Sequence, residues 1–417
     1  MRLSQFTFVA VLSLLGRSVL HAENWPEFRG PSAQGLSSER GLPVEWSATK
    51  NVAWKQSIPG QGWSSPVFVD GRVYLTSAVR SDSGSKLSLR ALCLDASGGK
   101  ILWDSEVFAS NEDVSIHKKN GHASPTPIVE GDRLYVHFGH QGTACLDLTG
   151  KVIWRNTSLR YHPVHGNGGS PILVEGALIF SCDAANDPFV AALDKANGEV
   201  LWKVKRETSA AKTFSFSTPL LIVVNGQKQV ISPGSNALCA YDPGTGREIW
   251  RVRYDGYSVV PRPILGHGLV FISTGFDRPV VMAIRPDGRG DVTDTHVAWT
   301  MSRGAPKTPS MLLVNDELFM VADNGVATCV DARTGRVHWQ ERVGGDCSAS
   351  LLCADGKIYI QNEEGVGTVI AADKEFRKLA SNPLEERTLA SYAVGQGVLF
   401  IRTERHLYCI QALAASQ

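Results

Sequence analysis

A short pattern that recurs along the chain constrains its fold more than any other feature. An apolar run ends in Asp, a Gly follows within a few residues, and a Trp comes four residues after that Gly. Successive members are separated by roughly 40 to 51 residues, a period typical of the blades of a β-propeller. Complete copies end at Trp103, Trp154, Trp202, Trp250 and Trp339, and Trp54 and Trp299 fit with looser upstream residues.

Each copy of the pattern has the chemistry of a β-hairpin. The Asp side chain can accept backbone N–H groups two residues on, and Gly tolerates the positive φ that ends the turn. The Trp of the next strand can pack its flat face against the adjoining sheet while its indole N–H finds a partner. We therefore predict that these tryptophans are buried between blades and contact no substrate.

A second set of turns predicts the number of blades. Eight short turns each separate two apolar runs, which indicates eight units of four strands. Proline shortly before the first strand of six units suits an inner strand whose N–H edge faces an open axis. The eight turns lie at residues 70–71, 130–131, 175–176, 225–226, 266–268, 315–316, 355–356 and 395–397.

The last unit lacks a Trp strand of its own. Residues 51–57, which contain Trp54, can supply it by pairing with the strand that holds Tyr408. Such pairing removes the exposed sheet edges of an open array. We predict an all-β, eight-bladed propeller of four-stranded antiparallel blades over residues 51–412, with an N-terminal surface segment at 23–50 and a C-terminal tail at 413–417.

The first 22 residues resemble an export signal. Arg2 precedes an apolar stretch from Phe6 to Gly16, and Ala22 ends a plausible cleavage site. A buried N-terminal strand or helix is the alternative. No later stretch approaches the roughly 18 apolar residues that a membrane span needs. We expect a soluble periplasmic or secreted protein without a transmembrane segment.

The charge balance argues against a nucleic-acid-binding surface, and the placement of the cysteines argues against disulfide bonds. Lys and Arg total 42 against 41 Asp and Glu, so no basic footprint for nucleic acid is present. Cys93, Cys145 and Cys329 hold one repeat position in different blades, too far apart for the short Cα–Cα distance of a disulfide. The eight cysteines are predicted to be small buried hydrophobes.

The repeat resembles the PQQ-like propeller family, which includes quinoprotein alcohol dehydrogenases, polyvinyl-alcohol dehydrogenases and the non-enzymatic propeller of outer-membrane protein assembly. Residues 24–31, 120–125 and 165–171 are similar to secreted bacterial PQQ-binding-like propellers. An enzyme of this family would carry PQQ with Ca²⁺. The chain departs from the enzymes because it has no Cys-Cys pair and no Cys-x-x-Cys-His. Their calcium ligands and catalytic Asp match no motif here, so no catalytic residue and no metal ligand is assigned.

Function is expected on the face opposite the short turns, because the longer loops there are free to vary. Histidines gather in these loops around the second and third units. They can ligate a metal, act as acid and base, or simply hydrogen-bond within the loops, and the spacing matches no zinc motif. Six histidines lie within residues 117–165: His117, His122, His137, His140, His162 and His165, and all but His137 are expected in loops of this face.

Cations and aromatic residues occupy loops of the same face. Lys119, Lys212 and Arg303 lie there with Phe214 and Tyr257. A flat polycarboxylate such as PQQ needs cations and an aromatic platform, for which Trp63 is the best candidate outside the repeat. Solvated loop charge is the alternative. The residues predicted to bind a cofactor or ligand are Trp63, His117, Lys118, Asn120, His122, His165, Asn167, Arg262 and Lys307.

Two functions follow from these observations. The first is an extracytoplasmic scaffold that binds a small molecule or a protein through this face. The alternative is a PQQ-dependent quinoprotein oxidoreductase that acts on alcohols or polymers. The cofactor distinguishes them, because only the enzyme needs PQQ together with a divalent metal.

Overall fold

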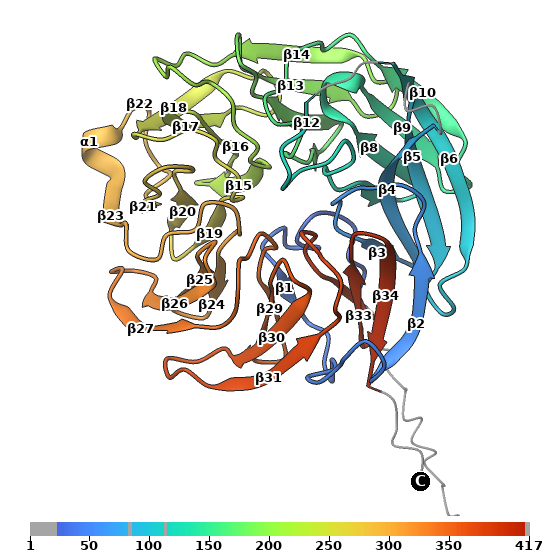
Figure 1. Cartoon of the computed structure of the whole chain (residues 1–417). Helices are drawn as coiled ribbons and strands as arrows, with labels where there is room; N and C mark the ends of the chain where they lie inside the picture. Colours follow the sequence, from blue (N-terminus) through green and yellow to red (C-terminus); the bar gives the residue numbers. More distant parts are fainter. Residues whose placement is uncertain (1–22, 82–85, 112–114, 413–417) are drawn as a thin grey trace, which may run out of the picture.

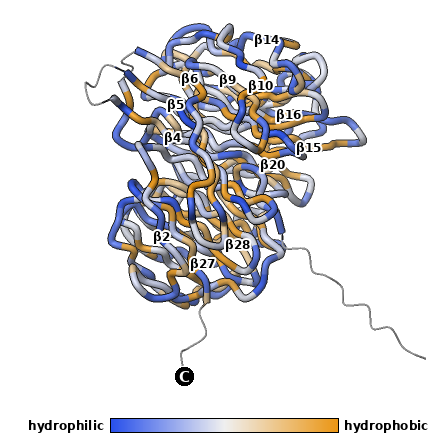
Figure 2. The backbone as a smooth tube through the Cα atoms, turned by 90° about the vertical axis from the view of Figure 1, so that its right-hand side faces the viewer, coloured by the Kyte–Doolittle hydropathy of each residue, from blue (hydrophilic) through white to orange (hydrophobic). Residues whose placement is uncertain are grey.

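Eight antiparallel sheets stand around a common axis in the computed structural model of this chain (Figure 1). The structure describes residues 23–81, 86–111 and 115–412. The predicted eight-bladed, all-β propeller is confirmed. Along each blade the first strand lies nearest the axis and the last lies outermost (Figure 1). Hydrophobic stretches run along the strands (Figure 2), and their buried residues form clusters shared by neighbouring blades.

The first four blades follow one another in chain order. Blade 4 carries an extra strand, β22 (Gly290–Asp291), paired in parallel with its outermost strand. Their strands are β3 (Val67–Val69), β4 (Arg72–Arg80), β5 (Leu87–Asp95) and β6 (Ile101–Ser110) in blade 1; β7 (Ile128–Glu130), β8 (Arg133–His137), β9 (Thr143–Asp147) and β10 (Val152–Asn156) in blade 2; β11 (Ile172–Val174), β12 (Ala177–Cys182), β13 (Phe189–Asp194) and β14 (Val200–Lys205) in blade 3; and β15 (Leu220–Val224), β16 (Gln227–Gly234), β17 (Ala237–Tyr241) and β18 (Glu248–Arg253) in blade 4.

The remaining blades complete the ring. A short helix, α1 (Thr293–His296), lies between two strands of blade 5, and a 3-10 turn, η1 (Gly139–Gln141), follows β8. Their strands are β19 (Ile264–Gly266), β20 (Leu269–Ser273), β21 (Val281–Ile284) and β23 (Val297–Met301) in blade 5; β24 (Leu312–Val314), β25 (Glu317–Val321), β26 (Val326–Asp331) and β27 (Val337–Arg342) in blade 6; β28 (Leu352–Ala354), β29 (Lys357–Gln361), β30 (Val366–Ala371) and β31 (Lys378–Pro383) in blade 7; and β32 (Ala393–Gly395), β33 (Val398–Arg402), β34 (His406–Gln411) and β2 (Val52–Ser57) in blade 8.

The ring closes as the sequence predicts. Strand β2, from the N-terminal side, pairs with β34, and Trp54 lies opposite Cys409. The eight short turns join the first and second strand of each blade, as Val69 opposite Arg72 shows in blade 1. Both turn residues there, Asp70 and Gly71, have positive φ, the backbone of the tightest hairpins.

The repeated Trp and Gly meet across blade boundaries. A Cβ on Gly99 would lie 2.5 Å from the Trp54 ring of the preceding blade, so only glycine fits there. The Trp54 indole N–H donates to the Ala96 carbonyl at 2.8 Å. The same bond recurs from Trp103, Trp154, Trp202, Trp299 and Trp339 to the blade that follows. These contacts join neighbouring blades and explain the spacing of the pattern.

Trp250 departs from this arrangement. Its indole donates to the side-chain oxygen of Gln229 at 2.8 Å, within its own blade. Between β21 and β23 of blade 5 the chain carries β22 and α1 in place of the repeated hairpin turn that receives the indole in other blades. Trp250 is nevertheless fully buried.

Residues 23–50, which we expected as a surface segment, run across the face of the short turns and into the axis. Trp25 forms a bridge with Phe68 of blade 1, and β1 (Leu36–Ser37) pairs in parallel with β28 of blade 7. The Trp46 N–H donates to Asn382 at 2.9 Å. Trp25, Arg29 and Trp46 are buried, so the segment closes this end of the propeller.

Three further predictions concern the ends of the chain, the cysteines and membrane spans. The predicted signal peptide, residues 1–22, and the C-terminal tail, residues 413–417, lie outside the described residues. All eight cysteines are buried, unpaired thiols. Among the helices of the described residues, none has the length and apolar character needed to cross a membrane.

Candidate functional site

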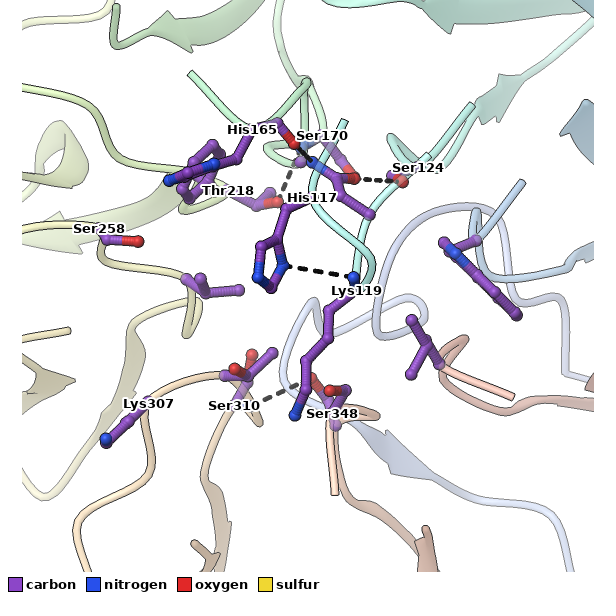
Figure 3. A pocket seen from close by; sticks show the side chains of 18 of the residues that line it. His117, Lys119, Ser124, His165, Ser170, Thr218, Ser258, Lys307, Ser310 and Ser348 are labelled. Atoms are coloured by element: carbon purple, nitrogen blue, oxygen red, sulfur yellow. Dashed lines mark hydrogen bonds between the residues drawn. The ribbon is translucent and has the colours of Figure 1, made fainter. Parts of the chain in front are cut away.

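A hollow of about 510 Å³ opens at the axis, on the face of the longer loops. We call it the axial hollow. Phe28 of the N-terminal segment contributes to its lining, because that segment closes the axis from the opposite face. Figure 3 shows His117 and Lys119 reaching toward its middle, with Lys307 at one side. The volume lies within the range of small-molecule pockets.

The floor of the axial hollow is a ring of hydroxyl groups. One residue just before the first strand of each blade stands at this level, and in seven blades it is Ser or Thr. The eighth place belongs to Arg262 of blade 5. We call these seven side chains the hydroxyl ring; they are Ser65, Thr126, Ser170, Thr218, Ser310, Ser350 and Ser391.

Hydrogen bonds link the ring from blade to blade. The Thr126 N–H donates to the Ser170 hydroxyl at 2.9 Å, and the Ser170 N–H donates to the Thr218 hydroxyl at 2.9 Å. The Ser65, Arg262, Ser310 and Ser350 N–H groups make equivalent bonds at 2.9–3.1 Å. These bonds use the N–H groups that the first strands turn toward the axis, and they hold the hydroxyl oxygens in place.

One wall of the hollow is aromatic. Phe214 lies 5.7 Å from Tyr257, which lies 6.3 Å from Phe276, measured between ring centroids. His165 adds its ring 5.4 Å from Phe214. Offset and edge-on contacts of this kind are favourable for aromatic pairs, so the rings form one continuous surface.

Two ammonium groups lie over that surface. The Lys212 Nζ is 4.3 Å from the Tyr257 centroid and 2.9 Å from its hydroxyl. The Lys307 Nζ is 4.6 Å from the Phe276 centroid. Such cation–π contacts fix a charge beside an apolar face. Asp323, a carboxylate in the lining, already accepts the Lys307 and Thr308 N–H groups at 2.7 and 3.1 Å.

Two histidines face each other at the mouth. The rings of His117 and His165 are 5.4 Å apart, and His117 Nδ1 accepts the Lys119 N–H at 3.3 Å. Partial burial, with the nearby His165 and lysine charges, lowers the pKa of His117. Near neutral pH the ring is therefore uncharged and carries its proton on Nε2, a single donor.

The loop that carries these groups is tied across the mouth. The Lys119 ammonium is 2.6 Å from Glu363 of blade 7. The Lys118 carbonyl accepts Arg387 at 2.7 Å, and the Arg387 guanidinium lies 5.3 Å from the Trp63 centroid. Lys119 is thus neutralised by a carboxylate, while Lys212 and Lys307 are held by rings and a phenol.

Five of the nine residues predicted to bind a ligand line the hollow, and their binding role stays a prediction. Asn120 uses its amide within the loop, donating to the His165 carbonyl at 2.8 Å and accepting the Ser124 hydroxyl at 2.6 Å. The five are Trp63, His117, Asn120, His165 and Lys307.

Four predicted residues lie outside the lining. Lys118 is exposed, and His122 Nε2 lies 3.2 Å from the Arg80 guanidinium. Asn167 is buried and joins His140, Phe138 and Tyr161 by hydrogen bonds. His122 and Arg262 therefore do not line the hollow with His117, His165 and Lys307.

Arg262 is near the axis but lies beneath the floor. Its guanidinium is buried and donates to the Phe28 carbonyl at 2.6 Å and to the Pro219 carbonyl at 3.0 Å. Glu27 lies 3.4 Å away. The prediction placed Arg262 in the open site because it treated residues 23–50 as a surface segment.

Sequence reasoning missed several lining residues. Phe28 came from the segment that we expected on the surface, and Phe276 sits in a short loop with no pattern. The hydroxyl ring did carry a signal, because Ser-Pro or Thr-Pro precedes the first strand in blades 1 to 4. The predicted histidine cluster splits, since His137 and His140 are buried within blade 2.

The described residues do not supply a metal site. No three of their His, Cys, Asp or Glu side chains gather in a way that could hold an ion. A flat polycarboxylate fits the wall of cations and rings, whereas a calcium ion beside it has no ligand set in the described part of the chain.

These features define a class, the eight-bladed propellers of PQQ-type repeats with a ligand-sized hollow at the axis. A family model described as "Outer membrane protein assembly factor BamB" (PQQ_2) matches residues 34–154, 88–295 and 288–405. The chain belongs to this family.

Two curated proteins match over shorter segments. The chain is 29% identical over 163 residues to methanol dehydrogenase [cytochrome c] subunit 1 of Methylorubrum extorquens, covering 33% of this chain and 24% of that protein. It is 26% identical over 114 residues to outer membrane protein assembly factor BamB of Burkholderia pseudomallei, covering 27% and 29%. The matched segments thus span less than a third of either relative.

Solved structures share the fold. BamB from Moraxella catarrhalis superposes with a TM-score of 0.58 at 13% identity, covering 86% of this chain and 99% of that one. The computationally designed Ika8 protein superposes with a TM-score of 0.59 at 10% identity, covering 89% and 100%. At these identities the likeness shows the propeller fold alone.

Proposed function

We propose that this protein is an extracytoplasmic binding propeller that takes a small anionic ligand with a flat ring in its axial hollow. One observation carries the proposal: Lys212 and Lys307 hold their charges over Tyr257 and Phe276 at the wall of a ligand-sized hollow. Binding sites of this size combine an apolar lining with a few placed polar groups. The location outside the cytoplasm rests on the export-like residues 1–22.

The two ammonium groups favour an anion because they have different partners from the other lysine of the hollow. Lys119 is paired with the Glu363 carboxylate at 2.6 Å. Lys212 bonds the Tyr257 phenol, which donates to Asp277 at 2.9 Å, and Lys307 lies over a ring, so neither ammonium has a direct carboxylate partner among the described residues. An anionic ligand beside them gains charge-assisted hydrogen bonds, and its ring gains stacking area on the aromatic wall.

A quinoprotein oxidoreductase is the second candidate. The similarity to methanol dehydrogenase subunit 1 over 163 residues favours it. PQQ is flat and tricarboxylic, so Lys212, Lys307 and the aromatic wall suit it, but the described residues lack a ligand set for calcium. We derive no redox step from these residues. The remaining alternative is that this face binds a segment of another protein. The name of the BamB relatives, an assembly factor, favours a protein partner.

Calorimetric titration of the purified protein tests the proposal. The probes are 2-naphthoate, its neutral analogue 2-naphthamide, and PQQ with and without Ca²⁺. We expect naphthoate and PQQ to bind without calcium, and naphthamide to bind at least tenfold more weakly because it lacks the charge. No binding of either acid to the wild-type protein would refute a small-anion site.

A matched pair of variants places the ligand. Lys307→Met removes the ammonium over Phe276, whereas Lys203→Met removes one that lies 4.0 Å from the Phe189 centroid, outside the hollow. We expect weaker naphthoate binding only for Lys307→Met. Dye-linked alcohol oxidation that appears only with PQQ and Ca²⁺ would favour the enzyme instead.

A further inference from the structure

The hydroxyl ring has hydrogen-bond donors that the fold does not use. The Ser350 oxygen accepts the Ser310 N–H at 3.1 Å, and the Ser391 oxygen accepts the Ser350 N–H at 2.9 Å. A hydroxyl that accepts in this way keeps its own proton to donate. Within the described part of the chain, no ring hydroxyl donates to a protein acceptor. Because the ring lines the hollow, these protons are available to whatever occupies its floor.

Positive charge lies directly beneath this ring. Arg262 and Arg29 are both buried, and the Glu27 carboxylate lies 3.4 Å from the Arg262 guanidinium. Arg29 donates to the carbonyls of Ser310 and Met311 at 3.3 and 2.6 Å, so it touches a ring residue from below. Burial and the neighbouring Arg262 lower the pKa of Arg29 to about 9, which leaves it charged at neutral pH.

Of these two buried guanidinium groups, Arg262 is paired with Glu27, whereas the bonds of Arg29 go to backbone carbonyls. A buried charge without a counter-ion is costly. An anion on the axis, just above the ring, would offset the excess charge through a short, poorly screened distance. This attraction is separate from that of Lys212 and Lys307, because both of these lysines stand at the wall and not beneath the ring.

We infer that the hydroxyl ring is a second, distinct subsite that binds a compact oxyanion group: a carboxylate, sulfate or phosphate. The group comes either from a free inorganic ion or from the acid end of the ligand in the axial hollow, and the latter source rests on the proposed function. Several hydroxyl donors arranged around one axis can bond the several oxygens of such a group, and hydrogen bonds to an ionised acceptor are stronger than neutral ones. A ligand with more than one acid group would then place one of them on the ring and another beside Lys212 and Lys307, with its flat ring against the wall.

The test uses the full-length protein with sodium sulfate and sodium phosphate, titrated at constant ionic strength. The variant Ser350→Ala/Ser391→Ala removes two ring hydroxyls. The control Ser217→Ala removes a buried hydroxyl that donates to the Pro261 carbonyl at 2.9 Å and lies outside the lining. We expect the double variant to bind sulfate at least tenfold more weakly, since one hydrogen bond to a charged group accounts for about that factor. The control should bind like the wild type.

A second measurement does not depend on the folding of a variant. Crystals of the wild-type protein soaked in selenate should show an anomalous peak on the axis, within hydrogen-bond distance of the ring hydroxyls. A peak only at surface lysines, or equal sulfate affinity in the double variant and the wild type, would overturn the subsite. Absence of sulfate binding by the wild type would overturn it as well.

Competition separates the two sources of the oxyanion and the two proposals. If sulfate raises the apparent dissociation constant of PQQ, which carries three acid groups, but not that of 2-naphthamide, an acid group of the ligand occupies the ring. If sulfate binds without competing, the ring takes a free ion. Failure of naphthoate to respond to Lys307→Met would remove the proposed function while leaving the sulfate result intact.

Discussion

The indole of Trp154 lies flat against Gly198 of the following blade, so close that a Cβ on the glycine would be 2.5 Å from the ring. The indole N–H also donates to the Lys195 carbonyl at 3.1 Å. Ring and turn therefore fit together as a unit at the boundary between blades 2 and 3. The same relationship joins most neighbouring blades, which is why the pattern of the sequence places Gly and Trp at fixed positions.

Gly198→Ala should destabilise the protein by more than the strain of an alanine at positive φ alone. Its φ is +78°, and the new methyl group would overlap the Trp154 ring. We expect a loss of about 2–4 kcal/mol, from backbone strain and overpacking together. Gly131→Ala is the control, because φ is +58° there but the space around it is open. Equal losses in urea denaturation would show that the contact with Trp154 contributes nothing.

Trp250→Ala should be among the most damaging single changes in the propeller. The side chain is fully buried and its N–H bonds the buried Gln229 at 2.8 Å. We expect the free energy of unfolding to fall by about 3–5 kcal/mol. Trp63→Ala should cost about 1 kcal/mol, because that ring lines the axial hollow and is only partly buried. A comparable loss at Trp63 would make it a core residue rather than a wall of the hollow.

The fold could be predicted because its cause is local and repeated. Asp, Gly and Trp at fixed spacing determine one hairpin and one blade contact, and the sum of such contacts determines the ring. Even closure by residues 51–57 followed from a missing Trp strand. The insertion of β22 and α1 in blade 5 carried no such signal, because it replaces the pattern rather than repeating it.

The candidate site was predicted less completely because its burial depends on distant parts of the chain. Arg262 looked open to the axis, yet Glu27 and Phe28 return from more than two hundred residues away to cover it. Asn167 looked like a loop donor, but Tyr161 and His140 consume its amide. His117, His165 and Lys307 could be placed near the axis because the loops that carry them lead into the first strands of their blades.

Stability should fall in acid because of one buried histidine. Burial, with the neighbouring His140, lowers the pKa of His137 to about 3 from an ordinary value of 6.5. Between these values the unfolded chain binds a proton that the folded chain does not, so stability is present above about pH 6.5 and is lost as pH falls. The expected slope is up to about 1.4 kcal/mol per pH unit.

His137→Asn is the variant that tests this assignment. It removes the ring that lies 4.3 Å from Phe180 and bonds Thr143, so the protein should be less stable at pH 7.5. Between pH 6 and 4.5, however, its free energy of unfolding should fall less steeply than that of the wild type, and the two curves should converge. Parallel curves over this range would assign the acid sensitivity to other groups.

Variants of Arg262 and Lys307 should affect different properties, the first the stability of the protein and the second its affinity for the ligand. Arg262→Met removes the buried partner of Glu27 and three hydrogen-bond donors to the Phe28 and Pro219 carbonyls and to that carboxylate. Breaking such a pair costs about 3 kcal/mol, because Glu27 is left in a site where burial already raises its pKa.

Lys307→Met removes a partly exposed ammonium and should change stability by less than about 0.5 kcal/mol. Urea denaturation and naphthoate titration of both variants give the comparison: Arg262→Met should lose mainly stability and Lys307→Met mainly affinity. A stable Arg262→Met protein would mean that the N-terminal segment closes the axis without this ion pair.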